Sequence, residues 1–198
     1  AAIDHGPALG HAGLFEQGGV DLSDSASAGR ATDAVKAELG RIDALLNIAG
    51  GFAWEKLENG SVDTWSRMFK LNVLTAANAS KAALPHLIEA RGAIVNVGAN
   101  GAVKAGAGMA AYAASKQGVM KLTEALAEEQ KGKVRVNAVL PSTIDTPANR
   151  DSSSSDRPRA AAGAAARRSS CTTSRPHRRS AGAVRAPGDA DTPPAQAT

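Results

Sequence analysis

The 198-residue sequence is poor in cysteine and in aromatic residues, with one Cys, one Tyr, two Trp and three Phe. A single cysteine, Cys171, excludes an intrachain disulfide framework, and nothing else indicates an oxidising compartment. No run of about 18 apolar residues is present, and the first residues lack the basic and apolar regions of a signal peptide. We therefore expect a soluble, cytoplasmic protein that does not act at a membrane.

Large apolar side chains and lysine are missing from one end of the chain. Residues 151–198 contain no Lys, Glu, Leu, Ile, Met, Phe, Tyr or Trp, but they hold eight of the 23 basic and four of the 19 acidic residues. The net charge of +4 therefore belongs to this segment, and residues 1–150 are neutral. Because the basic segment has no aromatic side chain for base stacking, no nucleic-acid partner is expected. The neutral segment 1–150 fits an enzyme for a small-molecule substrate better than a nucleic-acid-binding protein.

Residues 151–198 are expected to be a disordered tail rather than a second domain. Burial of their small side chains cannot offset the entropy lost on ordering them. A marginal Ala/Arg-rich helix over 160–168 is the alternative. The abundance of Ala, Arg, Pro and Ser also suggests a further hypothesis, translation of GC-rich DNA in a shifted reading frame. Residues 1–150 then form the folded domain.

Predicted strands and helices alternate along residues 1–150. A strand ends at Asp4, and mostly apolar runs typical of buried parallel strands follow at 19–22, 42–48, 93–97 and 134–140. Helices are predicted from the cap candidates at 23–27 to Gly40, over 61–90 with a kink at Pro85, and over 109–131. The alternation predicts an α/β fold, a doubly wound parallel sheet with helices on both faces.

Tyr112 and Lys116 form the most informative pair in the sequence. On a helix, residues four apart share a face, so the Lys116 ammonium can approach the phenol of Tyr112. A neighbouring cation lowers the pKa of a phenol from about 10, which makes it a proton donor near neutral pH. The alternative is that both are surface residues of an amphipathic helix.

Further polar and small residues stand near the ends of the predicted strands, and each has an ordinary alternative role. Asp4 could be a turn residue before His5, and a strand that ends in Ala-Gly is common. Asn72 lies inside a predicted helix, an unfavourable place for Asn, but it could simply be exposed. In chain order the set is Asp4, Asp21-Leu22, Asn47-Ile48-Ala49-Gly50, Asn72 and Tyr112-x-x-x-Lys116.

This ordered set resembles the short-chain dehydrogenase/reductase family, over residues 1 to 150, and implies a Rossmann-like sheet. The resemblance implies an NAD(P)-dependent oxidoreductase in which Tyr112 is the proton donor. Lys116 then lowers the pKa of Tyr112 and binds the nicotinamide ribose, and Asn72 orders a water of the proton relay. No metal site is expected.

The resemblance also implies a set of cofactor contacts. Asp4 accepts hydrogen bonds from the adenosine ribose and repels a 2′-phosphate, which favours NAD(H) without excluding NADP(H). Asp21 contacts the adenine edge. The remaining expected contacts are the Leu22 backbone, the strand end at Asn47, Ala49 and Gly50, the Ile144 backbone and the Thr146 hydroxyl.

One departure from the family concerns the substrate. The family has a serine 13 residues before its tyrosine, but this chain has Ala99 there. The segments at 49–52, 98–99, 105–109, 138–141 and 145–150 resemble the dihydropteridine reductase-like branch, in which a quinonoid pterin accepts the hydride and its own nitrogen takes the proton. Phe52 then offers an aromatic face to the flat ring, or it serves only loop packing. Reduction of a carbonyl remains the other reading.

A second departure is that the family's first strand and Gly-rich phosphate-binding turn do not precede Ala1. We expect an N-terminally truncated domain with an unpaired gap in its sheet. The alternative function is therefore a non-catalytic fragment that keeps a dimerisation surface on the helices at 61–90 and 109–131. Intact family members form homodimers or homotetramers.

Overall fold

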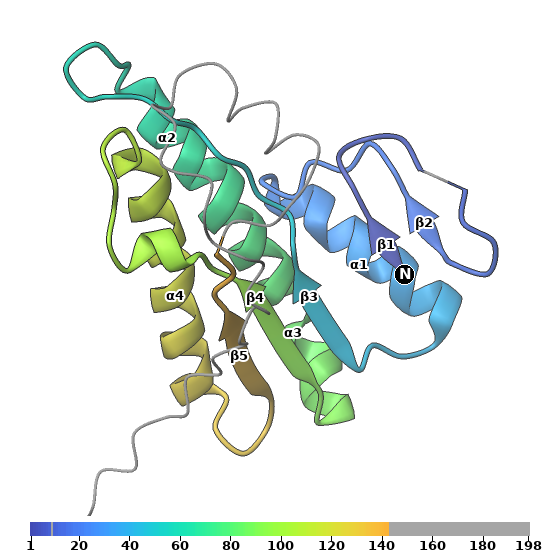
Figure 1. Ribbon diagram of the computed structural model, residues 1–198. Helices are drawn as coiled ribbons and strands as arrows, with labels where there is room; N and C mark the ends of the chain where they lie inside the picture. The colour runs from blue at the N-terminus through green and yellow to red at the C-terminus, as the bar shows by residue number, and fades with distance from the viewer. Residues whose placement is uncertain (9, 143–198) are drawn as a thin grey trace, which may run out of the picture.

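The computed structural model describes residues 1–8 and 10–142, which form parallel strands packed against helices (Figure 1). The strands are β1 (Ala2–Ile3), β2 (Glu16–Gln17), β3 (Ala44–Asn47), β4 (Ala93–Val97) and β5 (Arg135–Val139). The α-helices are α1 (Ser25–Leu39), α2 (Asp63–Phe69), α3 (Thr75–Ala90) and α4 (Ala110–Glu129). A π-helical segment, Lys70–Leu74, joins α2 to α3, and a 3₁₀ turn, Asn100–Ala102, follows β4. The expected residues Ile144 and Thr146 and the 151–198 tail lie outside the described part.

The sequence signals for α1 act as predicted. Asp24 is the N-cap, and its carboxylate accepts a hydrogen bond from the Ser27 N–H at 2.7 Å. Gly40 ends the helix in the left-handed region, with a φ of 74° that favours glycine. The predicted strand at 93–97 is also confirmed, with the same boundaries as β4.

The strands form two separately bonded sheets. β1 pairs with β2, and β3–β4–β5 form the larger sheet, with all pairs parallel. In the described residues no strand bridges β1 and β3, and the two remain separate in Figure 1. β3 is an edge strand of the larger sheet, and Leu46 in it and Ile48 just after it are 59% and 67% exposed. The predicted parallel α/β organisation is confirmed.

The core lies between the larger sheet and helices α3 and α4. Alternate strand residues such as Leu45, Ile94 and Val136 face these helices, whereas Leu46 points the other way. The buried cluster comprises Ala83, Leu87, Ile94, Val134 and Val136. The helices that pack on this sheet in the described part share one face, so the second layer of a doubly wound fold is not seen there.

Two predicted elements need correction. The strand expected at 19–22 lies earlier, at Glu16–Gln17. In the long helix, the sequence predicts an apolar face through Trp65, Met68, Phe69, Val73, Ala76, Ala77 and Leu84. Met68, Val73 and Ala76 are buried as expected, whereas Trp65 and Phe69 are 39% and 49% exposed. Thr64 and Asn72, which the prediction left out, are buried on the same side as Met68.

Candidate active site

Tyr112 lies in the first turn of α4, half-buried beside the loop that follows β3. The ring of Phe52 meets it edge to face, with centroids 4.9 Å apart and an interplanar angle of 73°. Burial raises the pKa of Tyr112 above its ordinary value. The phenol of Tyr112 is therefore neutral near neutral pH.

Lys116 lies one turn further along α4 and is buried, with 6% of its surface exposed. Its Nζ donates a hydrogen bond to the Val97 carbonyl at 2.8 Å, at the carboxyl end of β4. Burial lowers the pKa of Lys116. The expectation that Lys116 lowers the pKa of Tyr112 is not met in this structure, because the ammonium bonds to β4 and burial governs both pKa values.

Asn72 is buried at the centre of the π-helical segment, with 1% of its surface exposed. Its Oδ1 accepts a hydrogen bond from the Gly51 N–H at 2.9 Å, and its Nδ2 donates to the Gly51 carbonyl at 3.1 Å. Nδ2 also donates to the Ser115 hydroxyl on α4 at 3.0 Å. The alternative of an ordinary exposed asparagine is therefore wrong.

Gly50 brings Asn72 and Lys116 together. A Cβ on Gly50 would lie 2.5 Å from Asn72 Oδ1 and 3.3 Å from Lys116 Nζ, so a side chain does not fit without displacing them. The other side of Gly50 is exposed, which leaves its backbone open to a ligand. The loop after β3, the π-helical segment and α4 thus meet at one point.

The close approach of α4 to the π-helical segment depends on a second glycine. A Cβ on Gly118 would lie 2.9 Å from the Val73 side chain. Single π-turns inside α-helices often occur at functional sites, and this one is centred on Asn72. Gly118 therefore lets α4, with Tyr112 and Lys116, pack close to Asn72.

The acidic candidates lie at the carboxyl ends of β1 and β2. Asp4 is exposed, and its Oδ1 accepts a hydrogen bond from the Gly6 N–H at 2.9 Å, so it does have the turn role considered above. Asp21 Oδ1 accepts from both the N–H and the hydroxyl of Ser23. Hydrogen bonds from the hydroxyl and then the N–H of Ser23 are the main causes that lower the pKa of Asp21, and the nearby charge of Lys70 lowers it further.

The carbonyl of Leu22 is held by a residue that sequence reasoning missed. Asn78, on α3, donates through Nδ2 to the Leu22 carbonyl at 3.1 Å and to the Ser23 carbonyl at 3.0 Å. The available signal was a second asparagine inside the same long helix as Asn72. Asn78 fixes the turn between β2 and α1.

Asn47 points into the core rather than toward the open end of the sheet. Its Nδ2 donates to Asn96 Oδ1 at 2.8 Å and to the Ser80 hydroxyl at 3.0 Å. Asn96, in turn, donates to the Thr123 hydroxyl at 2.8 Å. This buried network ties β3 and β4 to both helices, whereas Ala49 and Gly50 are exposed where β3 ends.

The side of the site near Tyr112 is apolar. Ala99 is 6% exposed and supplies no hydroxyl. The loop with Phe52 continues through Trp54, whose ring lies against Gly108 so closely that a Cβ there would be 2.5 Å from the ring. The Glu55 N–H also donates to the Gly108 carbonyl at 2.8 Å. This loop is therefore joined to the segment leading into α4.

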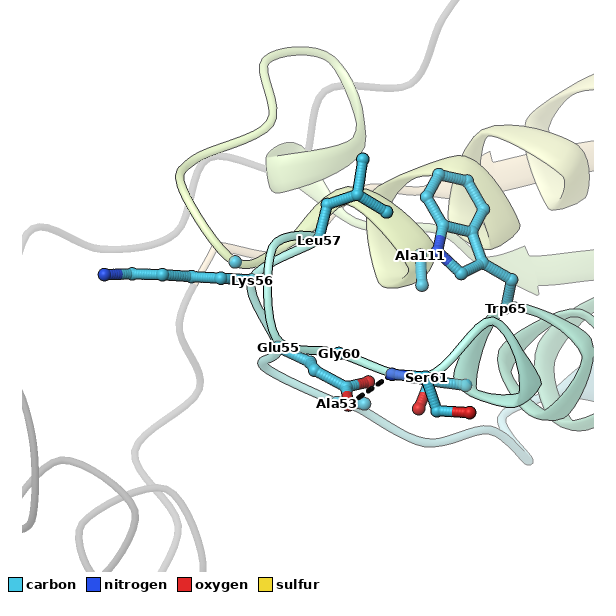
Figure 2. Close-up of a pocket in the computed structure, with 10 residues that line it drawn as sticks. Ala53, Glu55, Lys56, Leu57, Gly60, Ser61, Trp65 and Ala111 are labelled. Atoms are coloured by element: carbon cyan, nitrogen blue, oxygen red, sulfur yellow. Dashed lines mark hydrogen bonds between the residues drawn. The ribbon is translucent and has the colours of Figure 1, made fainter.

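Glu55 attaches the same loop to the start of α2 (Figure 2). Its carboxylate accepts a hydrogen bond from the Ser61 N–H at 2.9 Å, and a hydrogen bond with the Thr64 side chain is the main cause that lowers the pKa of Glu55. A small pocket lies between this loop and the first turns of α2 and α4, with Leu57, Trp65 and Ala111 among its lining residues. The loop that carries Phe52 is thus held at two points, to Gly108 before α4 and to Ser61 before α2.

Residues 1–8 and 10–142 contain no helix long and apolar enough to cross a membrane. The same residues contain no group of three or more His, Cys, Asp or Glu side chains placed to hold a metal ion.

Residues 11–157 match the family model described as short chain dehydrogenase. The chain belongs to the short-chain dehydrogenase/reductase family. Meso-2,3-butanediol dehydrogenase of Serratia marcescens is 37% identical over 128 residues, which cover 64% of this chain and 51% of that protein. The chain therefore spans about half the length of this curated relative.

Solved structures of other proteins show the same fold. Ligand-free aldohexose dehydrogenase of Thermoplasma acidophilum aligns with a TM-score of 0.71 and 31% identity, covering 76% of this chain and 58% of that one. ElxO with NADP bound aligns with a TM-score of 0.65 and 26% identity, covering 69% and 56%. The Rossmann-like fold class expected from the sequence is confirmed. The resemblance to the dihydropteridine reductase-like branch stays a prediction.

Proposed function

We propose that this chain contributes the reaction centre of an NAD(P)H-dependent oxidoreductase, which transfers hydride to a small carbonyl or imine-like substrate. The observation that carries the proposal is the meeting of Asn72 and Lys116 at the Gly50–Gly51 backbone after β3, with Tyr112 one helical turn before Lys116 and against Phe52 of the same loop. Ligands bind at this edge in open parallel α/β sheets. The cofactor supplies the hydride, and the residues of this chain handle the proton.

The residues present fit a nicotinamide cofactor at this edge. The exposed side of Gly50 lets a flat group approach the backbone. An ammonium has three N–H donors, so Lys116 can keep its bond to Val97 and still bind a ribose hydroxyl. Asp4 and Asp21 are proposed to contact the adenosine end of the cofactor, and Ile144 and Thr146 are proposed to contact its nicotinamide end.

Tyr112 is the proposed proton donor. Its pKa is raised by burial, and Lys116, one helical turn further along α4, is the positive charge proposed to act on the phenolate as it forms. Lys116 would then favour the charged phenolate, and Asn72 would order the water that returns the proton. The proposal is tested by mixing the 198-residue chain with NADH and each of a panel of small ketones and following the absorbance of NADH, which falls as NADH is oxidised. No oxidation with any substrate, despite NADH binding, contradicts it.

Asp4 supports NAD(H) as the preferred cofactor, since a carboxylate repels a 2′-phosphate. ElxO was solved with NADP, so NADP(H) remains in the proposal. Comparing kcat/KM for NADH and NADPH in the wild type and in Asp4→Ser tests the role of Asp4. The ratio should move toward NADPH in the variant, and an unchanged ratio removes Asp4 from cofactor selection.

Reduction of a quinonoid dihydropterin is the second candidate reaction. It is favoured by the buried Ala99 in place of a hydroxyl donor and by the aromatic Phe52 beside Tyr112. A pterin nitrogen can take a proton without a hydroxyl that polarises a ketone. Turnover of the dihydropterin and of simple ketones, measured side by side, separates the two, and faster turnover of ketones removes the pterin reading.

A non-catalytic role is the third candidate, favoured by the two separately bonded sheets of the described residues. The exposed Trp65 and Phe69 on α2 then form part of a dimerisation surface for a homodimer or homotetramer. Fluorescence titration with NADH is the discriminating experiment. Specific micromolar binding counts against this reading.

A further inference from the structure

We infer that Ser115 is a positioning residue that holds the Asn72 side chain on the helix carrying Tyr112 and Lys116. The inference rests on the proposed function, because it assigns a role within the same reaction centre. Ser115 is buried, with 3% of its surface exposed, directly before Lys116 and three residues after Tyr112.

The hydrogen bonds of the Ser115 hydroxyl define which partner it donates to and which it accepts from. It donates its proton to the Tyr112 carbonyl at 2.7 Å, so a lone pair is left to accept from Asn72 Nδ2 at 3.0 Å. Among the described residues, this is the side-chain hydrogen bond that connects Asn72 to α4. The side chain of Asn72 therefore reaches the helix with the acid and the ammonium through Ser115.

The other partners of Asn72 fix the same orientation of its amide. Gly51 presents its N–H to Oδ1 and its carbonyl to Nδ2. A flipped amide would place donor against donor at the Gly51 N–H, and acceptor against acceptor at the Gly51 carbonyl. Ser115 completes this arrangement from the opposite element, so Asn72 is held between the loop after β3 and α4.

Loss of the Ser115 hydroxyl should make Asn72 and the Gly50–Gly51 backbone, which lie beside the Lys116 ammonium, less ordered. Asn72 would lose its acceptor on α4, and the Gly50–Gly51 backbone packed on Asn72 would gain freedom to move. Small displacements of groups that orient reacting atoms cost much more in rate than in stability. The stability of the domain depends far more on its apolar core.

Thr123 offers a matched control on the same helix. Its hydroxyl also donates to a backbone carbonyl, that of Val119 at 2.8 Å, and also accepts from a buried asparagine amide, that of Asn96 at 2.8 Å. Ser115→Ala and Thr123→Val each remove one buried hydroxyl with the same bonding pattern. Only the first removes one that touches Asn72.

The first readout is steady-state turnover in the variants. Ser115→Ala should lower kcat by about tenfold or more with KM changed less than about twofold, while Thr123→Val stays near wild type. The double variant Ser115→Ala/Asn72→Ala should be no slower than Asn72→Ala alone, because Ser115 acts through Asn72. Equal losses in Ser115→Ala and Thr123→Val, or additive losses in the double variant, would overturn the inference.

The second readout does not need turnover, so it separates this inference from a failure of the proposed function. The pKa of Lys116 can be followed by the ¹³Cε chemical shift against pH. Because burial lowers this pKa, it should rise in Ser115→Ala and stay at the wild-type value in Thr123→Val. An unchanged Lys116 pKa in Ser115→Ala overturns the positioning role, whether or not the wild type oxidises NADH.

Discussion

The region around β3, β4 and α4 differs sharply from the region around β1 and β2. β4 has five residues, Ile94 is fully buried, and the polar side chains at the strand ends bond to one another. β1 and β2 have two residues each, and Asp4 is exposed. The residues proposed for proton transfer therefore lie beside a well-packed core, whereas the proposed adenosine contacts follow two short strands. The reaction centre is the better pre-organised part.

The largest expected effect is on the activity of a variant at the buried Lys116, where activity and stability should respond differently. Lys116→Met should lower kcat/KM by about 10²-fold or more, the range for loss of an acid–base group. It should not lower the free energy of unfolding, because the methionine needs no hydration whereas the buried ammonium has a lowered pKa.

Since the folded pKa of Lys116 is depressed, the wild type should gain stability relative to Lys116→Met as the pH rises above that pKa. Urea unfolding of both proteins at several pH values measures this difference. A Lys116→Met variant that is less stable than wild type at neutral pH would show that the ammonium stabilises the fold.

The next prediction tests the contrast in packing. Ile94→Ala, in β4, should lower the free energy of unfolding by about 2–5 kcal/mol, since it removes a fully buried side chain. Ile3→Ala, in β1, should cost clearly less, because Ile3 is only partly buried. Denaturant titration followed by circular dichroism measures both. Equal losses would mean that the two regions are packed equally well.

The smallest effect concerns the loop beside Tyr112. Hydrogen bonds to Thr64 and Ser61 lower the pKa of Glu55 below its ordinary value of 4.5. A depressed carboxyl pKa gives stability that is present above 4.5 and lost as the pH falls through the folded pKa. The difference in melting temperature between wild type and Glu55→Gln should therefore vanish in acid. A difference that persists there would assign the effect to packing.

The sequence predicted those features that depend on local pattern. The ends of β4 follow from its apolar run, and Gly40 marks the end of α1. The spacing of Tyr112 and Lys116 identified the helix that carries them. The inward direction of Asn47 could also have been read, because Asn47 lies two residues after Leu45 and shares its face of β3.

The contacts of the site could not be predicted in this way, because they join residues far apart in the chain. The bond from Lys116 to the Val97 carbonyl depends on how α4 packs over β4. The bond from Asn78 to Leu22 spans 56 residues. The π-helical segment around Asn72 packs against α4 at Gly118, and this contact has no local signal in the sequence.

The most direct test of the proposed reaction centre is NADH oxidation by the wild type and by Tyr112→Phe, measured at equal NADH occupancy. Tyr112 is the only tyrosine in the chain, and Tyr112→Phe keeps the ring beside Phe52 while removing the phenolic proton. The account predicts turnover by the wild type and a loss of about 10²-fold or more in the variant, with NADH binding unchanged. Equal turnover by the two proteins would contradict it.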